Sequence, residues 1–337
     1  MLFQWMRLGF AGVAFALIAV VTGCGGSSSS GGGIPMGPGP TAVPTLGITD
    51  FGGLTAGSKP ADLALGPDGN MWFTEQNGGR IGRMTPSGQV AEFVEPIVNQ
   101  PVGIVAAIDG NLWAAGVNAI DRLTPGGAFT QFVYPTANAG GGEIVNGPDG
   151  RLWFAQTLAG QIGAVTTNGA IAEYPLASNT SLPVGMTLDP NRAGVWFTEY
   201  GANAIGLMLP SGAIANLFTI PTPNSQPISI VAGPDGALWF AEYGAAKIGR
   251  MTPGGGFSEY SLAPGSQPNA ITAGVDGNLW FVEYGANKVG RITPAGIITE
   301  FAIPTAGSQP VAIRPGAGRT LWFAEYGVSR IGEVQNF

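Results

Sequence analysis

Short apolar runs separated by turn residues recur along the chain from about residue 46 onward. In the clearest stretch the runs lie at 267–271, 279–284, 288–292 and 297–301. An Asp-Gly turn (276–277), a Gly-Ala-Asn loop and a Pro-Ala-Gly turn (294–296) separate them. Runs of strand length that lack a helical period and are bounded by such turns predict β-strands joined by hairpins.

A tryptophan marks the same point of each repeated unit. Apart from one near the N-terminus, the tryptophans lie 40 to 43 residues apart: Trp72, Trp113, Trp153, Trp196, Trp239, Trp280 and Trp322. Seven units of four short strands predict an all-β fold, a seven-bladed β-propeller of antiparallel blades. We expect each tryptophan to pack one blade against the next.

The two ends of the repeat array predict how the ring closes. The last copy ends near Val334, after its third strand. The segment 47–51 (Gly-Ile-Thr-Asp-Phe) has the pattern of a fourth strand such as 297–301. We therefore expect an N-terminal strand to complete the last blade and cover its edge. The propeller domain is assigned to residues 45–337.

The first 23 residues have the pattern of a lipoprotein signal peptide. An apolar run at 8–21 follows Arg7 and is short for a membrane-spanning helix. It ends in Val-Thr-Gly-Cys (21–24), which resembles a bacterial lipobox; an ordinary secretory signal is the alternative. Residues 24–44, rich in Gly, Ser and Pro, are expected to form a tether. These features predict a bacterial cell-envelope protein with a membrane anchor at acylated Cys24, facing the periplasm or the exterior.

The composition limits the chemistry open to this propeller. The chain has 337 residues, 56 Gly, 27 Pro, one Cys and no His, and 14 Lys and Arg against 21 Asp and Glu give a net charge of −7. One Cys excludes a disulfide framework and a cysteine-based zinc site. The lack of His removes the commonest general base near neutral pH. Sparse basic residues argue against nucleic-acid binding. A closed ring needs no partner for stability, so a monomer is expected.

The repeated motifs carry a family resemblance. From about residue 46 to the end, the chain resembles the streptogramin B lyases (virginiamycin B lyase family). The resemblance lies in the repeated frame Trp-Phe-Thr-Glu, Ile-Gly-Arg-Ile-Thr and Ile-Thr-Glu-Tyr, followed by Leu/Ile-Pro-Thr. The resemblance implies a seven-bladed propeller. It also implies an enzyme that opens a cyclic depsipeptide antibiotic by elimination at its ester bond, with magnesium as cofactor.

The catalytic positions that this resemblance implies hold other residues here. The family's lyases place a His directly after the Pro that begins the first strand of each of the last two blades, where this chain has Asn269 and Val311. Family glutamates correspond to Gln309 and Tyr326, with an acid one place before the latter at Glu325. Asn and Val take no proton at neutral pH, and Gln cannot replace a carboxylate on magnesium. We therefore expect no lyase activity of that type.

Acidic and aromatic residues are expected together at one mouth of the central channel. In a four-stranded antiparallel blade the start of the first strand and the end of the second lie at the same end. The residues three and four places after each Trp therefore gather around one rim. From the fourth blade on, these candidate ligand-binding residues are Glu199, Tyr200, Glu242, Tyr243, Glu283, Tyr284, Glu325 and Tyr326. Glu283 and Glu325 are also candidate metal ligands. The alternative is structural, since a Glu repeated in most blades is what the fold itself would require.

Two functions follow from these residues. The first is a binding module that presents the Glu/Tyr rim to a small molecule, a glycan or a protein. The alternative is an enzyme, either a divergent magnesium-dependent lyase acting by C–O elimination on a cyclic depsipeptide or related ester, or a metal-dependent lactone or ester hydrolase. Three or more rim carboxylates converging at metal distance would favour the enzyme, whereas carboxylates engaged within their blades would favour the binding module.

Overall fold

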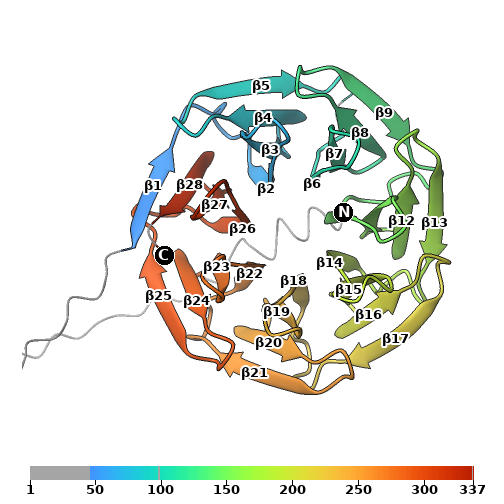
Figure 1. Ribbon diagram of the computed structural model, residues 1–337, viewed down its shortest axis with the longest axis vertical. Coiled ribbons are helices and arrows are strands. Elements are labelled where there is room, and N and C mark those ends of the chain that lie inside the picture. The colour runs from blue at the N-terminus through green and yellow to red at the C-terminus, as the bar shows by residue number, and fades with distance from the viewer. Residues whose placement is uncertain (1–45, 98, 336) are drawn as a thin grey trace, which may run out of the picture. The chain divides into compact units, whose positions relative to one another are not determined.

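The computed structural model describes residues 46–97, 99–335 and 337, and Leu46–Phe337 form one compact unit (Figure 1). The predicted signal peptide, the tether and Cys24 lie outside the described residues. Every regular element of the described part is a β-strand, and no helix there is long and apolar enough to cross a membrane.

The described strands form seven antiparallel sheets of four strands each. The innermost strands are β2 (Pro60–Leu65), β6 (Gly103–Ala106), β10 (Ile144–Asn146), β14 (Pro183–Leu188), β18 (Pro227–Ala232), β22 (Pro268–Ala273) and β26 (Pro310–Pro315). The second strands are β3 (Met71–Glu75), β7 (Leu112–Ala115), β11 (Leu152–Gln156), β15 (Val195–Glu199), β19 (Leu238–Glu242), β23 (Leu279–Glu283) and β27 (Thr320–Glu325).

The outer half of each sheet follows the same order. The third strands are β4 (Arg80–Met84), β8 (Ala119–Leu123), β12 (Gln161–Val165), β16 (Ala204–Met208), β20 (Lys247–Met251), β24 (Lys288–Ile292) and β28 (Arg330–Gln335). The outermost strands are β5 (Val90–Val94), β9 (Phe129–Val133), β13 (Ile171–Pro175), β17 (Ile214–Thr219), β21 (Phe257–Ser261), β25 (Ile298–Ala302) and β1 (Gly47–Phe51).

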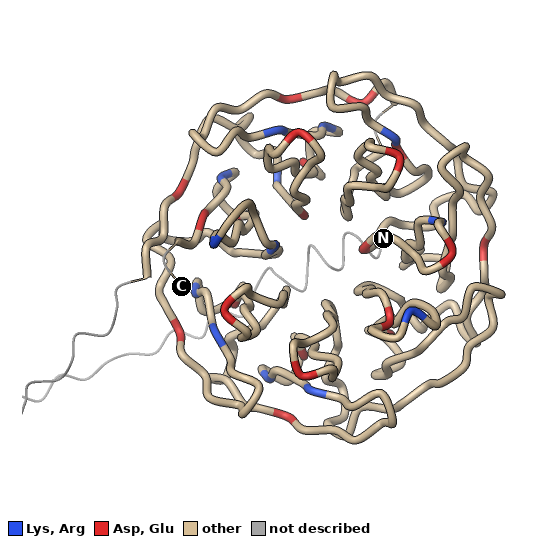
Figure 2. The backbone as a smooth tube through the Cα atoms, in the orientation of Figure 1, with Lys and Arg blue, Asp and Glu red and all other residues tan. Residues whose placement is uncertain are grey.

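The sheets stand as blades around a central axis, with the innermost strands at the centre (Figure 1). We number them so that blade 1 holds β2–β5 and blade 7 holds β26–β28 with β1. Acidic positions recur around the outermost strands (Figure 2). The predicted all-β fold, a seven-bladed β-propeller, is confirmed for the described part of the chain.

The N-terminal strand closes the ring. β1 pairs antiparallel with β28, and Ile48 lies opposite Val334. The ring of Phe51 stacks on Trp322 with a centroid distance of 5.4 Å. The Thr305 hydroxyl donates to Asp50 at 2.6 Å. As the sequence predicts, β1 supplies the fourth strand of blade 7, so the edge of β28 is paired rather than exposed.

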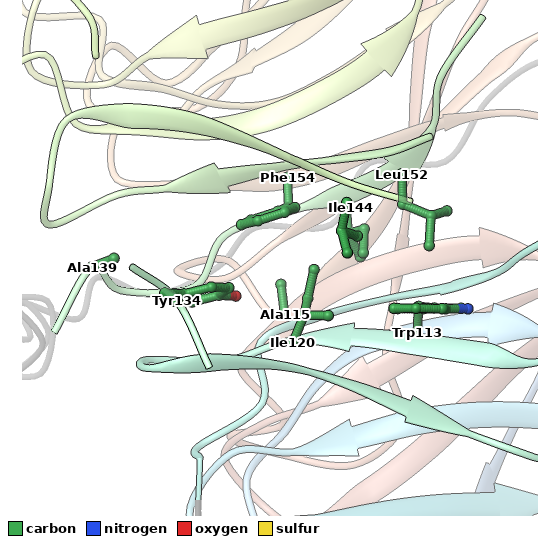
Figure 3. Packing of buried hydrophobic residues seen from close by; sticks show 9 residues of the cluster. Trp113, Ala115, Ile120, Tyr134, Ala139, Ile144, Leu152 and Phe154 are labelled. Atoms are coloured by element: carbon green, nitrogen blue, oxygen red, sulfur yellow. The ribbon is translucent and has the colours of Figure 1, made fainter. Parts of the chain in front are cut away.

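The hydrophobic core lies between the blades. Seven clusters of buried apolar side chains in the described part each combine residues of two neighbouring blades. Between blades 2 and 3, for example, Trp113 and Ile120 pack with Ile144, Leu152 and Phe154 (Figure 3). Burying one such side chain contributes about 1.5–3 kcal/mol. Neighbouring blades therefore cover both faces of the second strands, and all five residues of β3 are buried.

The repeated tryptophans are held by the turns that precede them. Trp239 Nε1–H donates to Asp235 at 3.0 Å, and Trp196 Nε1–H donates to Asp189 at 2.8 Å. The Trp239 ring also stacks on Tyr260 of the outermost strand, with centroids 5.6 Å apart. Aspartates of the preceding turns therefore orient indoles that pack between blades, and the packing is as the repeat pattern predicts.

Candidate functional site

The rim glutamates are buried. Each ends the second strand of its blade opposite the proline that begins the innermost strand, and the set is Glu75, Glu199, Glu242, Glu283 and Glu325. None is more than 2% exposed. The sequence places these side chains on the surface of the mouth, whereas the structure puts them beneath it. The reason is that the second strands are covered on both faces by the adjoining blades.

Each of these glutamates except Glu199 lies in a blade whose outermost strand carries an acid. Glu242 extends over Gly249 of β20, where a Cβ atom would lie 2.7 Å from Glu242 Oε1. Glu259 of β21 is paired with this glycine in register. The equivalent outer acids are Glu92, Glu300 and Asp50. The glycine of the third strand therefore makes room for two carboxyl groups to meet.

The outer acid of the blade 5 pair, Glu259, is ionised. Glu259 accepts hydrogen bonds from the N–H and hydroxyl of Thr222 at 3.2 and 2.8 Å, and it pairs with Lys247 at 3.1 Å. Burial raises the pKa of Glu259, but these contacts outweigh burial and hold the pKa below its usual value. Thr222 lies in the loop that leaves blade 4, so this carboxylate also ties blade 5 to its neighbour.

The inner acid of the pair is neutral near pH 7. Burial and the charge of Glu259 raise the pKa of Glu242 to about 8. The same causes, burial and the outer acid, raise the pKa of Glu283 to about 7 and that of Glu325 to about 8. Neither carboxyl oxygen of Glu242 accepts a hydrogen bond from a described donor. A proton on Glu242 directed at Glu259 satisfies both groups, so the pair acts within its blade.

These carboxyls are not gathered into a metal-sized group in the described part of the chain. The described residues contain no group of three or more Asp, Glu, His or Cys side chains that could hold a metal ion. Glu283 and Glu325, the candidate metal ligands, are buried acids of different blades. At the positions that the family resemblance implies for acids, the chain has Gln309 and Tyr326. An amide and a phenol are poor substitutes for carboxylates on magnesium, so the residues present do not fit that ion.

Four tyrosines lie next to the buried glutamates, and three of them are partly exposed. Each follows directly after the buried glutamate of blades 4 to 7: Tyr200, Tyr243, Tyr284 and Tyr326. Three are half-buried, and Tyr284 is 8% exposed. Burial and the proximity of Tyr284 and Tyr200 raise the pKa of Tyr243, and burial and Tyr326 raise the pKa of Tyr284 to about 12. Successive tyrosines are therefore close neighbours, and we call this set the tyrosine arc.

Polar groups adjoin the end of the tyrosine arc at blade 7. The Tyr326 hydroxyl donates to Gln76 Oε1 at 3.4 Å. Lys59 Nζ lies 4.6 Å from the centroid of the Tyr326 ring, a cation–π contact. The arc therefore offers aromatic faces beside an amide and an ammonium group, which suits recognition by stacking and hydrogen bonding.

The positions to which the family resemblance assigns catalytic histidines lie at the same mouth. Asn269 and Val311 are the second residues of β22 and β26, directly after the prolines paired with the buried glutamates. Both are half-buried. Gln309, just before β26, has a left-handed backbone with φ of 48°. The same position is left-handed in every blade: Lys59, Gln100, Gly140, Leu182, Gln226, Gln267 and Gln309. This strain therefore belongs to the blade rather than to one catalytic residue.

Two charged clusters were not predicted from the sequence. Arg314 of β26 contacts Glu143 and Asp62, which belong to blades 3 and 1. In blade 2, Asn99 bridges two buried acids, with its N–H on Glu95 and its Nδ2 on Asp121, both at 2.9 Å.

A signal for each cluster is present in the sequence. Asp121 replaces the glycine that the other blades have in the third strand, and Arg314 is the charged exception at its position of the innermost strands. Their partners are far apart in the chain, so the repeat alone does not reveal the contacts.

Comparison with known proteins identifies the family. Residues 43–263 and 192–336 match the sequence model of the Virginiamycin B lyase family. The chain belongs to this family. A virginiamycin B lyase of Nocardia farcinica (strain IFM 10152) is 30% identical over 140 residues, which cover 41% of this chain and 49% of that protein. The match thus spans about half the length of this curated relative.

Solved structures of virginiamycin B lyases share the propeller. The Staphylococcus aureus virginiamycin B lyase is 34% identical, with a TM-score of 0.81 over 87% of this chain and 100% of that chain. A second structure is that of a catalytically inactive S. aureus enzyme with quinupristin, in which one histidine is replaced by alanine. Its TM-score is 0.82 at the same identity and coverage. The present member of the virginiamycin B lyase family contains no histidine at all.

Proposed function

We propose that this chain is a ligand-binding propeller of the virginiamycin B lyase family that lacks the family's lyase activity. Its contact surface is the tyrosine arc at the mouth formed by blades 4 to 7. The ligand is a small molecule, a glycan or a protein segment that stacks on these rings. The buried glutamates do not touch the ligand and instead fix the blade ends from which the tyrosines project.

The one-sided placement of the tyrosines carries this proposal. The tryptophans recur in all seven blades, as packing requires, whereas the tyrosines of the arc occur only in blades 4 to 7. The equivalent residues of blades 1 to 3 are Gln76, Val117 and Thr157. A feature required by the fold would recur around the ring, so an aromatic surface on one side of the mouth is better explained by a ligand that binds there.

The groups at the mouth also support the loss of lyase activity. Elimination at an ester needs a general base placed near the reacting carbon. Asn269 and Val311 provide none, and the acids nearest to them lie beneath the surface, with pKa values raised to about 7 and about 8. The competing function, a divergent magnesium-dependent lyase or a metal-dependent lactone or ester hydrolase, needs exposed carboxylates that converge.

The proposed location is the bacterial cell envelope. An acylated Cys24 and the tether that follows would hold the propeller at a membrane, facing the periplasm or the exterior. Metabolic labelling with a fatty-acid analogue should mark the wild-type chain and leave Cys24→Ser unlabelled. Equal labelling of both would contradict the anchor.

The binding function can be tested on glycan and peptide arrays with residues 25–337, which contain every described strand. We expect the double variant Tyr243→Ala/Tyr284→Ala not to bind the ligands that the wild type binds. Val117→Ala changes the equivalent position of blade 2 and should leave binding unchanged. Binding that survives the double variant would show that the arc is not the contact surface.

The lyase activity can be tested with a streptogramin B antibiotic and magnesium, using mass spectrometry to detect the linearised product. We expect no product above the rate without protein, while the S. aureus enzyme serves as the positive control. Product formation that is abolished by Glu283→Gln or Glu325→Gln would overturn the proposal and favour the enzyme.

A further inference from the structure

A second candidate site lies at the centre of the ring, away from the tyrosine arc. A cavity of about 350 Å³ is lined by residues of all seven innermost strands. Outside blade 3 the lining comes from the later part of each innermost strand, such as 63–65 in blade 1 and 104–106 in blade 2. The tyrosine arc adjoins the first residue of these strands. The cavity is therefore in the half of the ring nearer the turns that join the first and second strands.

The wall of this cavity is mostly apolar. Leu, Ile, Val, Ala and Met side chains line it, and its polar side chains are Glu143, Thr187, Thr272 and Arg314. The Arg314 position carries small or apolar residues in the other blades: Ala64, Val105, Val145, Thr187, Val231 and Thr272. Ring closure does not need an arginine at this point, since the other innermost strands lack one. Arg314 is therefore a local specialisation of the cavity.

Arg314 spans the ring centre through one of its nitrogens. Its Nη2 lies 2.5 Å from Glu143 Oε1 and 3.0 Å from Asp62 Oδ1. The second oxygens of these carboxylates are also engaged, because Asp62 accepts from Ile104 N–H at 3.1 Å and Glu143 accepts from Met186 N–H at 2.9 Å. Among the described residues, no acceptor is bonded to Nε or Nη1 of Arg314. The guanidinium is thus fixed in place and still holds free donors.

The charges around Arg314 determine what those donors can bind. Asp62 and Glu143 together bring up to two negative charges against the single positive charge of the guanidinium. An anionic ligand would meet this negative excess. A carbonyl oxygen accepts hydrogen bonds from Nε–H or Nη1–H without adding charge, and the apolar wall suits a hydrocarbon body.

We propose that this central cavity binds a small uncharged molecule with an apolar body and a carbonyl oxygen, as in a ketone, an amide, an ester or a lactone. The carbonyl accepts from Arg314, and the body packs on the Val, Ile and Leu side chains of the wall. The volume lies near the lower end of the range of about 300–1,000 Å³ that small-molecule pockets cover. This site does not depend on the tyrosine arc, so either can exist without the other.

The proposal can be tested with the fluorescent naphthalene ketone prodan, which is uncharged and brightens in apolar surroundings. Residues 25–337 should bind it saturably with one site per chain. Thr187→Phe fills the cavity from β14 without changing the charged groups and should weaken binding at least tenfold. Thr219→Phe makes the same exchange at an exposed position of the same blade and should bind like the wild type.

A second variant tests the role of the guanidinium. Arg314→Lys keeps a cation beside Asp62 and Glu143 but removes the Nε and Nη1 donors, and it should weaken prodan binding about three- to tenfold, the value of one hydrogen bond. Absence of saturable binding to the wild type, or equal binding by Thr187→Phe and Thr219→Phe, would overturn the proposal. The proposal would also be overturned if Tyr243→Ala/Tyr284→Ala lost prodan binding while Thr187→Phe kept it. That result would place prodan at the tyrosine arc.

Discussion

At the scale of single residues, Gln156 of blade 3 stands where blades 1 and 4 to 7 carry a buried glutamate. Its Nε2 donates to Glu173 Oε1 of the outermost strand at 2.7 Å. Glu173 also accepts from the hydroxyl of Thr136 at 2.8 Å, as Glu259 does from Thr222. An amide donor thus serves in blade 3 where a protonated carboxyl serves in blade 5. The pairs need a hydrogen-bond donor at the inner position, not a negative charge.

This reasoning predicts the effect of Glu242→Gln. The folded-state pKa of Glu242 is about 8, above its ordinary value of 4.5, so folding retains a proton that the unfolded chain releases between these values. Through Glu242 the wild type therefore loses stability as pH rises through this range, and the glutamine variant lacks this contribution to the loss. At pH 9 we expect Glu242→Gln to be more stable than the wild type by about 1–3 kcal/mol. Chemical denaturation at pH 5 and pH 9 measures this difference.

A matched variant separates the inner acid from the outer one. Glu259→Gln removes the charged acceptor of Thr222 and Lys247, so it should destabilise the protein by about 1–3 kcal/mol at pH 7. If Glu242→Gln shows the same pH dependence as the wild type, the inner acid is not the protonated member of the pair.

The burial of these glutamates could not be read from the sequence. Glu242 follows Leu-Trp-Phe-Ala, and strand alternation alone does not show that both faces of the strand are covered. That fact depends on the neighbouring blades, which the local sequence does not describe. The tyrosines were easier to place, because they lie beyond the strand end in a turn. The Arg314 contact with Glu143 joins residues 171 positions apart and follows only from the closed ring.

At the scale of elements, most of the structure was predictable. Turn residues and apolar runs recur in the same order in each unit, so errors in one copy are corrected by the others. Blade 3 is the least regular case, since β10 covers only Ile144–Asn146 and begins after three glycines. No proline starts this strand. The side chain of Glu143, just before it, accepts a hydrogen bond from the N–H of Met186 in blade 4. Here a side chain supplies an inter-blade contact that the repeat pattern does not predict.

The closing strand β1 gives a prediction at this scale. Phe51 stacks on Trp322 just as Phe93 stacks on Trp72 within blade 1, at 5.4 Å in both cases. Phe51→Ala and Phe93→Ala should each cost about 2–4 kcal/mol of unfolding free energy, because each removes a half-buried aromatic ring. No hairpin joins β1 to the other strands of blade 7, because β1 is followed in the chain by β2 of blade 1. Phe51→Ala should therefore also speed amide hydrogen exchange in β28, the strand that β1 covers.

Hydrogen exchange resolved by residue distinguishes the two variants. In Phe93→Ala the equivalent third strand, β4, remains joined to β5 by a hairpin and should stay protected. Equal loss of protection in β4 and β28 would mean that the seam opens no more readily than any other blade.

At the scale of the whole molecule, the buried acids act together on stability. Burial, with the outer acids, raises the pKa of Glu242 and Glu325 to about 8 and that of Glu75 and Glu283 to about 7. The folded state then binds more protons than the unfolded chain between about pH 4.5 and 8, so the free energy of unfolding falls as pH rises through this window. Below it, acids with a lowered pKa such as Glu259 become protonated and their stabilisation is lost. Stability should therefore peak near pH 5, and calorimetry should give a Tm at pH 9 more than about 5 °C below that at pH 5.5. A Tm that rises between these pH values would show that the inner acids are ionised in the folded ring.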